Sequence, residues 1–286
     1  MKEISQIVAV HCQYMTDNGE LAEIIERSKK PVIIPLVPEL SCNYLKTPRG
    51  TRIYGYIHSE ENHYPDWGLE WLKNNRDNPD FTFAQEGYRH CCEMDFLKMQ
   101  ENLKHGRGKQ PDPYHEYVCA NGKAMSFLYQ AEVMLLGKEL LWKELCIDPK
   151  IHISANNSEN KNTLKAVKDN KFQYHLPRNG FDYPAPGLIN LPAYRDEGLI
   201  ILPETYPRRR KTSPVIMFYY NRIGENEKTR KQFFRYLERS VPISELPIED
   251  KPHSKVILNQ WMIRAYKRMR DFNERVTKKK AKEDEK

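Results

Sequence analysis

The sequence predicts an α/β fold built on a parallel sheet, and three features of the chain support this. Short runs of apolar, largely β-branched residues recur along the 286 residues. Segments between them place their apolar residues at helical spacing. The first forty residues or so read as strand, helix, strand, an order that implies a parallel sheet with a right-handed crossover. Because the alternation continues over most of the chain, we expect one α/β layer or barrel fold.

The N-terminal half supplies the first βαβ unit. Residues 4–10 are an apolar run that ends before Asp17, Asn18 and Gly19, which are turn formers. ELAEIIERSK at 20–29 has its apolar residues on one helical face, and prolines bracket the next apolar run at 31–38. WGLEWLKNN at 67–75 predicts a helix, and FTFA at 81–84 predicts a third strand.

The second half repeats the pattern. A long helix is expected over 120–145, a strand over 151–154 and a helix over 162–170. Two late strands at 198–203 and 215–220 precede a helix at 228–238. From Pro252 an amphipathic helix fades into a charged tail, so we expect a barrel domain over 1–250 and a C-terminal helix and tail over 251–286.

Composition excludes several classes of protein. The net charge of +7 is modest for this length and falls short of a dedicated nucleic-acid binder. No apolar run reaches the roughly 18 residues of a membrane-spanning helix. The N-terminus lacks the features of a secretion signal, which predicts a cytoplasmic protein with reduced thiols. The six cysteines form no CxxC pair, which argues against a zinc ribbon.

Polar and ionisable groups gather where the predicted strands end. His11 and Cys12 follow the first strand, FAQEGYRHCCE at 83–93 brings Glu86 and His90 after the third, and Asn156 and Asn157 follow the fourth. In α/β folds the carboxyl ends of parallel strands share one edge, and functional groups gather there. We therefore expect these side chains to meet around one pocket.

Several segments resemble the polysaccharide deacetylase superfamily, whose fold is a distorted (β/α)7 barrel. PVIIPLVPE at 31–39 resembles the second strand of that family, and EGYRH at 86–90 resembles its metal-binding motif. Residues 135–176 resemble its helix, strand, polar loop and following helix, and residues 215–238 its last strand and helix. The resemblance implies a metal-dependent carbohydrate deacetylase with a carbohydrate substrate.

The chain also departs from the family pattern. The first strand ends in VHCQ without the usual pair of aspartates, Glu86 replaces the first histidine of the metal motif, and the late Leu-x-x-His motif is absent. In the set that remains, Glu86 and His90 would hold a divalent metal, zinc by preference, with His11 or Cys12 as a further ligand. Only one of His11 and Cys12 can face inward, because neighbouring strand residues point to opposite faces.

The remaining roles follow from the same interpretation. His11 and Asp17 are the expected catalytic residues, and the expected substrate-binding residues are Asn156, Asn157, Arg178 and Tyr183. The alternative is a catalytically inactive barrel that serves as a glycan- or partner-binding module, in which Glu86 forms a structural ion pair and His90 a structural hydrogen bond.

Overall fold

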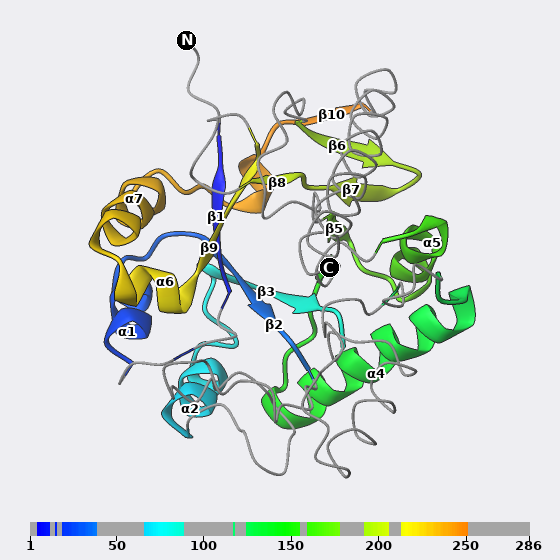
Figure 1. Ribbon diagram of the computed structural model, residues 1–286, viewed down its shortest axis with the longest axis horizontal. Helices are drawn as coiled ribbons and strands as arrows, with labels where there is room; N and C mark the ends of the chain where they lie inside the picture. Colours follow the sequence, from blue (N-terminus) through cyan, green and yellow to red (C-terminus); the bar gives the residue numbers. More distant parts are fainter. Residues whose placement is uncertain are drawn as a thin grey trace, which may run out of the picture.

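The computed structural model describes residues 5–11, 15, 19–38, 66–88, 117, 124–154, 159–177, 192–205 and 213–250. Within them, parallel strands form one curled sheet with helices on its outer side (Figure 1). The strands are β1 (Ile7–His11), β2 (Val32–Leu36), β3 (Phe81–Glu86), β4 (Ile151–Ile153), β5 (Tyr174–Leu176), β6 (Ala193–Asp196), β7 (Leu199–Ile201), β8 (Glu204–Thr205), β9 (Val215–Tyr219) and β10 (Ile248–Asp250). The helices are α1 (Glu20–Arg27), α2 (Asp66–Asn74), α4 (Phe127–Leu145), α5 (Lys161–Asp169), α6 (Tyr220–Glu225), α7 (Glu227–Leu237) and the 3-10 helix η3 (Ile243–Glu245).

The sheet closes into a barrel through one bent segment. Its strand order is β10-β6-β7-β5-β4-β3-β2-β1-β9-β8, which places β7 and β8 far apart. In the chain, however, only Leu202 and Pro203 separate them. Residues 199–205 thus pair with β5 through β7 and with β9 through β8. The strands that form the barrel are therefore β1 to β5, the combined β7–β8 segment and β9. This confirms the expected distorted (β/α)7 arrangement.

Alternation along the strands separates an inner core from an outer one. The buried side chains that point to one face of the sheet lie inside the barrel, among them Ile7 and Ala9 of β1, Ile33 of β2 and Met217 of β9. The side chains on the other face of the sheet pack against the helices. The outer cluster that they form with α1, α2 and α7 includes Val8, Val10, Ile34, Phe83 and Phe218. The side-chain period of two fixes which strand-end residues face inward.

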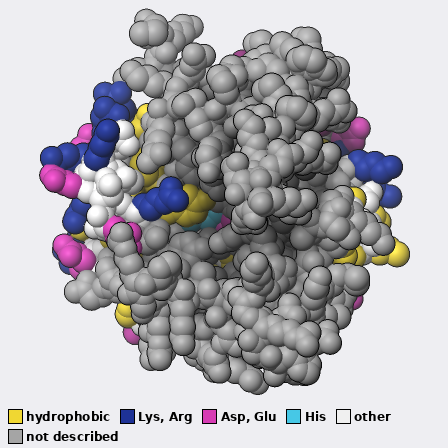
Figure 2. Space-filling view, viewed as in Figure 1, with side chains coloured by type: hydrophobic (Ala, Val, Ile, Leu, Met, Phe, Trp, Pro, Cys, Tyr) yellow, Lys and Arg dark blue, Asp and Glu magenta, His cyan; other side chains and the backbone are white. Residues whose placement is uncertain are grey.

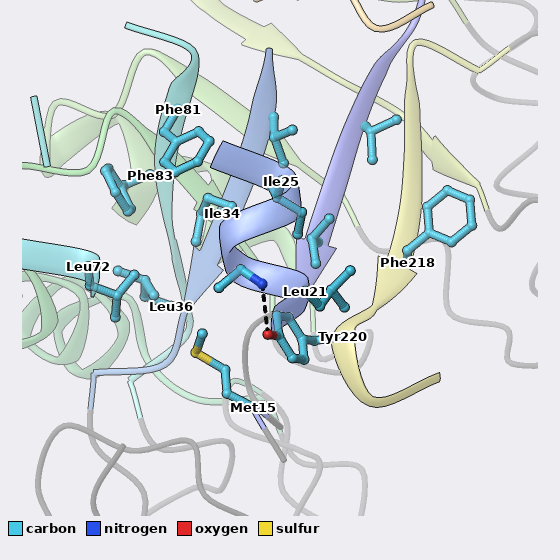
Figure 3. Close-up of a cluster of buried hydrophobic side chains, with 14 of the residues drawn as sticks. Met15, Leu21, Ile25, Ile34, Leu36, Leu72, Phe81, Phe83, Phe218 and Tyr220 are labelled. Carbon is cyan, nitrogen blue, oxygen red and sulfur yellow. Dashed lines mark hydrogen bonds between the residues drawn. The ribbon is translucent and has the colours of Figure 1, made fainter. Parts of the chain in front are cut away.

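The outer core also contains a specific polar contact. The backbone N–H of Ala22 in α1 donates a hydrogen bond of 3.0 Å to the hydroxyl of Tyr220, in the first residue of α6 (Figure 3). Gly19, with a φ of 93°, precedes α1 and supplies no side-chain cap. Tyr220 therefore satisfies one of the backbone donors that the first turn of a helix leaves without an intrahelical acceptor.

Most expected elements are present, with shifted ends. The helix expected over 120–145 begins at Phe127, because the hydroxyl of Ser126 accepts from the Tyr129 N–H and caps it. The prediction missed β5, β6, β10 and α6. The strand expected over 198–203 contains β7, but its antiparallel pairing with β6 was not expected. The predicted C-terminal helix and tail over 251–286 lie outside the described residues.

Candidate functional site

The inner face of the barrel carries a histidine and a glutamate in direct contact. His11 is the last residue of β1 and Glu86 the last of β3. His11 Nδ1 lies 2.5 Å from Glu86 Oε2, and both side chains are fully buried. The two atoms form a close polar contact, which does not have the geometry of a hydrogen bond. Two strand ends that are 75 positions apart in the sequence thus meet at the carboxyl end of the barrel.

Strand register explains why the two side chains reach each other. His11 points to the same face of the sheet as Ile7 and Ala9, and Glu86 points to the same face as Ala84, because alternate residues of a strand share a face. All three of these apolar residues belong to the inner cluster. The strand between them, β2, pairs with both neighbours in parallel. His11 therefore takes the inward position that the sequence left open between it and Cys12. Cys12 itself lies outside the described residues.

A tyrosine and an arginine extend the pair toward the surface. Tyr219 of β9 is the register partner of His11, and the two rings stack with centroids 5.1 Å apart and planes 26° apart. The guanidinium of Arg222 lies over the ring of Tyr219, 4.9 Å from its centroid. Tyr219 is half-buried and Arg222 is exposed, so the stack leads from the barrel interior to solvent.

Figure 2 shows the molecule from the same side as Figure 1. Figure 2 shows a histidine side chain in a hollow near the centre of the face, beside hydrophobic and basic side chains. In the same orientation, Figure 1 shows β2 and β3 at the centre of the view, with β1 beside them. Neither Tyr219 nor Arg222 is among the site residues that the sequence predicts. The signal for both was their place at or just after the end of a predicted strand.

The described residues supply only part of a metal site. They contain no group of three or more His, Cys, Asp or Glu side chains arranged to hold an ion. A catalytic zinc usually takes three protein ligands, and the described part of the site offers one imidazole and one carboxylate that already bind each other. The other expected ligands, Cys12 and His90, lie outside the described residues, so the metal site stays a prediction.

The other expected site residues are also untested. Asp17, Asn156, Asn157, Arg178 and Tyr183 lie outside the described residues. Ser154, directly after β4, is described: its hydroxyl is buried and makes no hydrogen bond within the part of the chain that the structure describes. It is a further polar group at the carboxyl end of the barrel.

A second cluster of buried polar side chains lies on the face of β4 and β5 that points away from the barrel interior. His152 and His175 are register partners with their Nδ1 atoms 3.2 Å apart. The Tyr117 hydroxyl lies 2.8 Å from His152 Nε2, and Glu159 Oε1 lies 3.3 Å from His175 Nε2. Burial, together with the neighbouring His175, lowers the pKa of His152 well below its ordinary value, so this imidazole is neutral at pH 7.

Comparison with known proteins gives similarity of structure alone. No family model and no curated protein matches the sequence. Among solved structures, the BpsB deacetylase domain from Bordetella bronchiseptica aligns with 60% of this chain and 63% of its own, at 11% identity and a TM-score of 0.35. A de-N-acetylase from Aggregatibacter actinomycetemcomitans aligns with 74% of this chain and 68% of its own, at 9% identity and a TM-score of 0.37.

Another similar structure belongs to a different enzyme. The 4-alpha-glucanotransferase from Thermococcus litoralis aligns with 87% of this chain and 33% of its own, at 14% identity and a TM-score of 0.43. The chain therefore spans less than two thirds of the length of two of these three proteins. Polysaccharide deacetylases are among the structures that the chain resembles, and the site has to be interpreted from its own residues.

Proposed function

We propose that this chain is a carbohydrate-modifying hydrolase that removes an acetyl group from a sugar or polysaccharide precursor. The contact between His11 and Glu86 at the carboxyl end of the barrel is the observation that carries the proposal. Functional groups of barrel enzymes lie at this end of the strands. A histidine whose Nδ1–H is held by a carboxylate is the usual arrangement of a general base.

The proposed role of each residue follows from the proton positions. Glu86 faces His11 Nδ1, and in the proposed mechanism its negative charge favours a proton on this nitrogen and a lone pair on Nε2. Nε2 takes a proton from the water that attacks the acetyl carbonyl, and Glu86 stabilises the imidazolium that forms. The bond from the carbonyl carbon to the sugar nitrogen or oxygen then breaks, and His11 returns the proton to that atom. The products are acetate and the free amine or hydroxyl.

Metal dependence is a separate part of the proposal. A divalent ion held by His90, Cys12 and the second oxygen of Glu86 would polarise the acetyl carbonyl and its attacking water. The proton steps above use His11 and Glu86 alone and do not depend on it.

The full burial of His11 and Glu86 favours a second candidate, a catalytically inactive barrel that binds glycans or a partner. A base has to reach its substrate, and a buried ion pair can also serve only to fill the barrel. In that case replacing either residue would lower stability and leave glycan binding intact.

Acetate release separates the two candidates. The purified protein is incubated with N-acetylated and O-acetylated oligosaccharides, with added Zn²⁺ or with chelator, and its metal content is measured. We expect His11→Asn and Glu86→Gln to lower the rate by about 10²-fold or more while remaining folded by circular dichroism. His152→Asn is the matched control, since it removes another fully buried imidazole on the outer side of the barrel. No acetate from the wild-type protein under any of these conditions would transfer the assignment to the binding module.

A further inference from the structure

Arg222 presents a cation at the carboxyl end of the barrel, beside the pair of His11 and Glu86. Its side chain is exposed, and its guanidinium lies 4.9 Å from the centroid of the Tyr219 ring. Tyr219 in turn stacks on His11, with 5.1 Å between the ring centroids. Adding these two distances puts the guanidinium at most about 10 Å from the His11 ring. One or two sugar rings bridge such a distance, so both groups are within reach of one bound oligosaccharide.

The local fold fixes the position of this cation. Tyr219 and Arg222 are three residues apart at the start of α6, so their side chains lie on the same side of its first turn. The buried side chains of Tyr220 and Ile223 anchor α6 in the outer cluster. The ring of Tyr219 holds the guanidinium, because a cation is attracted to the face of an aromatic ring. An incoming anion therefore meets a cation that is already in place, which lowers the entropic cost of binding.

The stack covers the face of the guanidinium and leaves its edge available. Arginine carries five N–H donors in one plane, and their geometry matches two oxygens of a carboxylate or phosphate. Arg222 forms no ion pair with the residues that the structure describes. In contrast, the exposed Arg27 of α1 is paired with Glu23. The charge and the donors of Arg222 are thus available to a ligand.

We propose that the glycan bound at this site is anionic, and that Arg222 selects it by binding a carboxylate or phosphate group. The inference rests on the proposed function, because it takes the contact between His11 and Glu86 as the place where the acetylated sugar binds. The charged group belongs to that sugar or to the next one, given the distance between Arg222 and His11. The net charge of +7 favours the same class of ligand, since a basic protein attracts anions from solution.

Titration calorimetry with defined oligosaccharides tests the specificity. The probes are N-acetylated oligosaccharides of equal length: one neutral, one with a uronic acid at alternate sugars and one with a phosphate ester. We expect the wild-type protein to bind at least one anionic probe about tenfold or more tightly than the neutral probe, because hydrogen bonds to charged groups are the stronger ones. Arg222→Gln should remove this difference, and Arg222→Lys should restore part of it, since lysine keeps the charge without the planar donors. The probe that loses more affinity in Arg222→Gln tells a carboxylate from a phosphate.

Arg235→Gln is the matched control. Arg235 is also exposed, and it also lies over a half-buried tyrosine, 5.6 Å from the ring centroid of Tyr236. Tyr236 packs against the outer cluster, away from the barrel interior. This variant should keep the wild-type preference for the anionic probe.

Three outcomes overturn the proposal. The wild-type protein binds neither anionic probe more tightly than the neutral one; Arg222→Gln keeps the preference; or Arg235→Gln loses it to the same extent. Acetate is measured separately in the same samples, so this proposal and the proposed function can fail independently. A preference that depends on Arg222, without acetate release, would refute the reaction and keep the specificity. Acetate release without any preference would refute the specificity alone.

Discussion

The Nδ1 atoms of His152 and His175 face each other at 3.2 Å, which allows only one proton between them. Glu159 Oε1 lies 3.3 Å from His175 Nε2, without the geometry of a hydrogen bond. The Tyr117 hydroxyl lies 2.8 Å from His152 Nε2, and the tautomer of His152 decides which of the two groups donates. Tyr117, His152 and His175 therefore form one buried chain of hydrogen bonds that can run in either direction.

This arrangement predicts that stability falls as the pH is lowered. Burial depresses the pKa of His152 in the folded protein, so below about pH 6.5 the unfolded chain binds a proton that the folded protein resists. Stability is thus fully present above that pH and is lost progressively below it. Other titratable side chains around the pair are Glu86 and Glu159.

Urea unfolding between pH 5 and pH 8 measures the effect. The free energy of unfolding of the wild-type protein should decrease from pH 7 to pH 5, and the decrease should be smaller in His152→Phe, even though that variant is less stable at pH 8. An identical pH slope in the two proteins would show that His152 is not the group responsible.

A second prediction concerns Gly137, in the middle of α4. A Cβ atom at this position would lie 2.2 Å from Nε2 and 2.7 Å from Cδ of Gln85, whose amide donates to the Met134 carbonyl on the same helix. Gly137→Ala forces the buried Gln85 side chain to move and should destabilise the fold by about 1–3 kcal/mol. The midpoint of urea unfolding is the measurement.

Gly224 is the matched control for this effect. It lies in α6, and a Cβ atom there would have no neighbour within 4 Å. Gly224→Ala is expected to be neutral or to stabilise by up to about 1 kcal/mol, because alanine has the higher helix propensity. Equal losses in the two variants would rule out the contact with Gln85 as the cause.

The fold was largely predictable from the sequence because most of its elements are long or strongly patterned. The runs that became β1, β2 and β9 are continuous and apolar, as strands covered on both faces have to be. The elements that were missed are short. The β6–β7 hairpin turns at Glu197 and Gly198, both at positive φ, and a glutamate gives little sequence signal for such a turn.

The site was predictable only in part. Strand-end position and alternation are local properties, and they were enough to single out His11 and Glu86. That their side chains form one contact across β2 depends on the register of three strands, which no local pattern contains. The pair of His152 and His175 was missed for the same reason, since it forms only when β4 and β5 lie side by side.

A third prediction tests how the outer core anchors α1. The Tyr220 hydroxyl is buried and accepts from the Ala22 N–H, which has no acceptor within the first turn of its own helix. Tyr220→Phe keeps the ring within the apolar cluster and removes only the acceptor, so the N–H is left buried and unpaired. The expected loss is about 1–3 kcal/mol in the free energy of unfolding.

Hydrogen exchange locates this loss. The amides of α1 should exchange faster in Tyr220→Phe, whereas those of α5, on the other side of the barrel in Figure 1, should keep their rates apart from any global change in stability. Phe234→Leu is a suitable comparison, because Phe234 lies at the edge of the same cluster but makes no polar contact with α1. If both variants speed exchange in α1 equally, then the hydroxyl contributes nothing specific and packing alone holds this helix against the barrel.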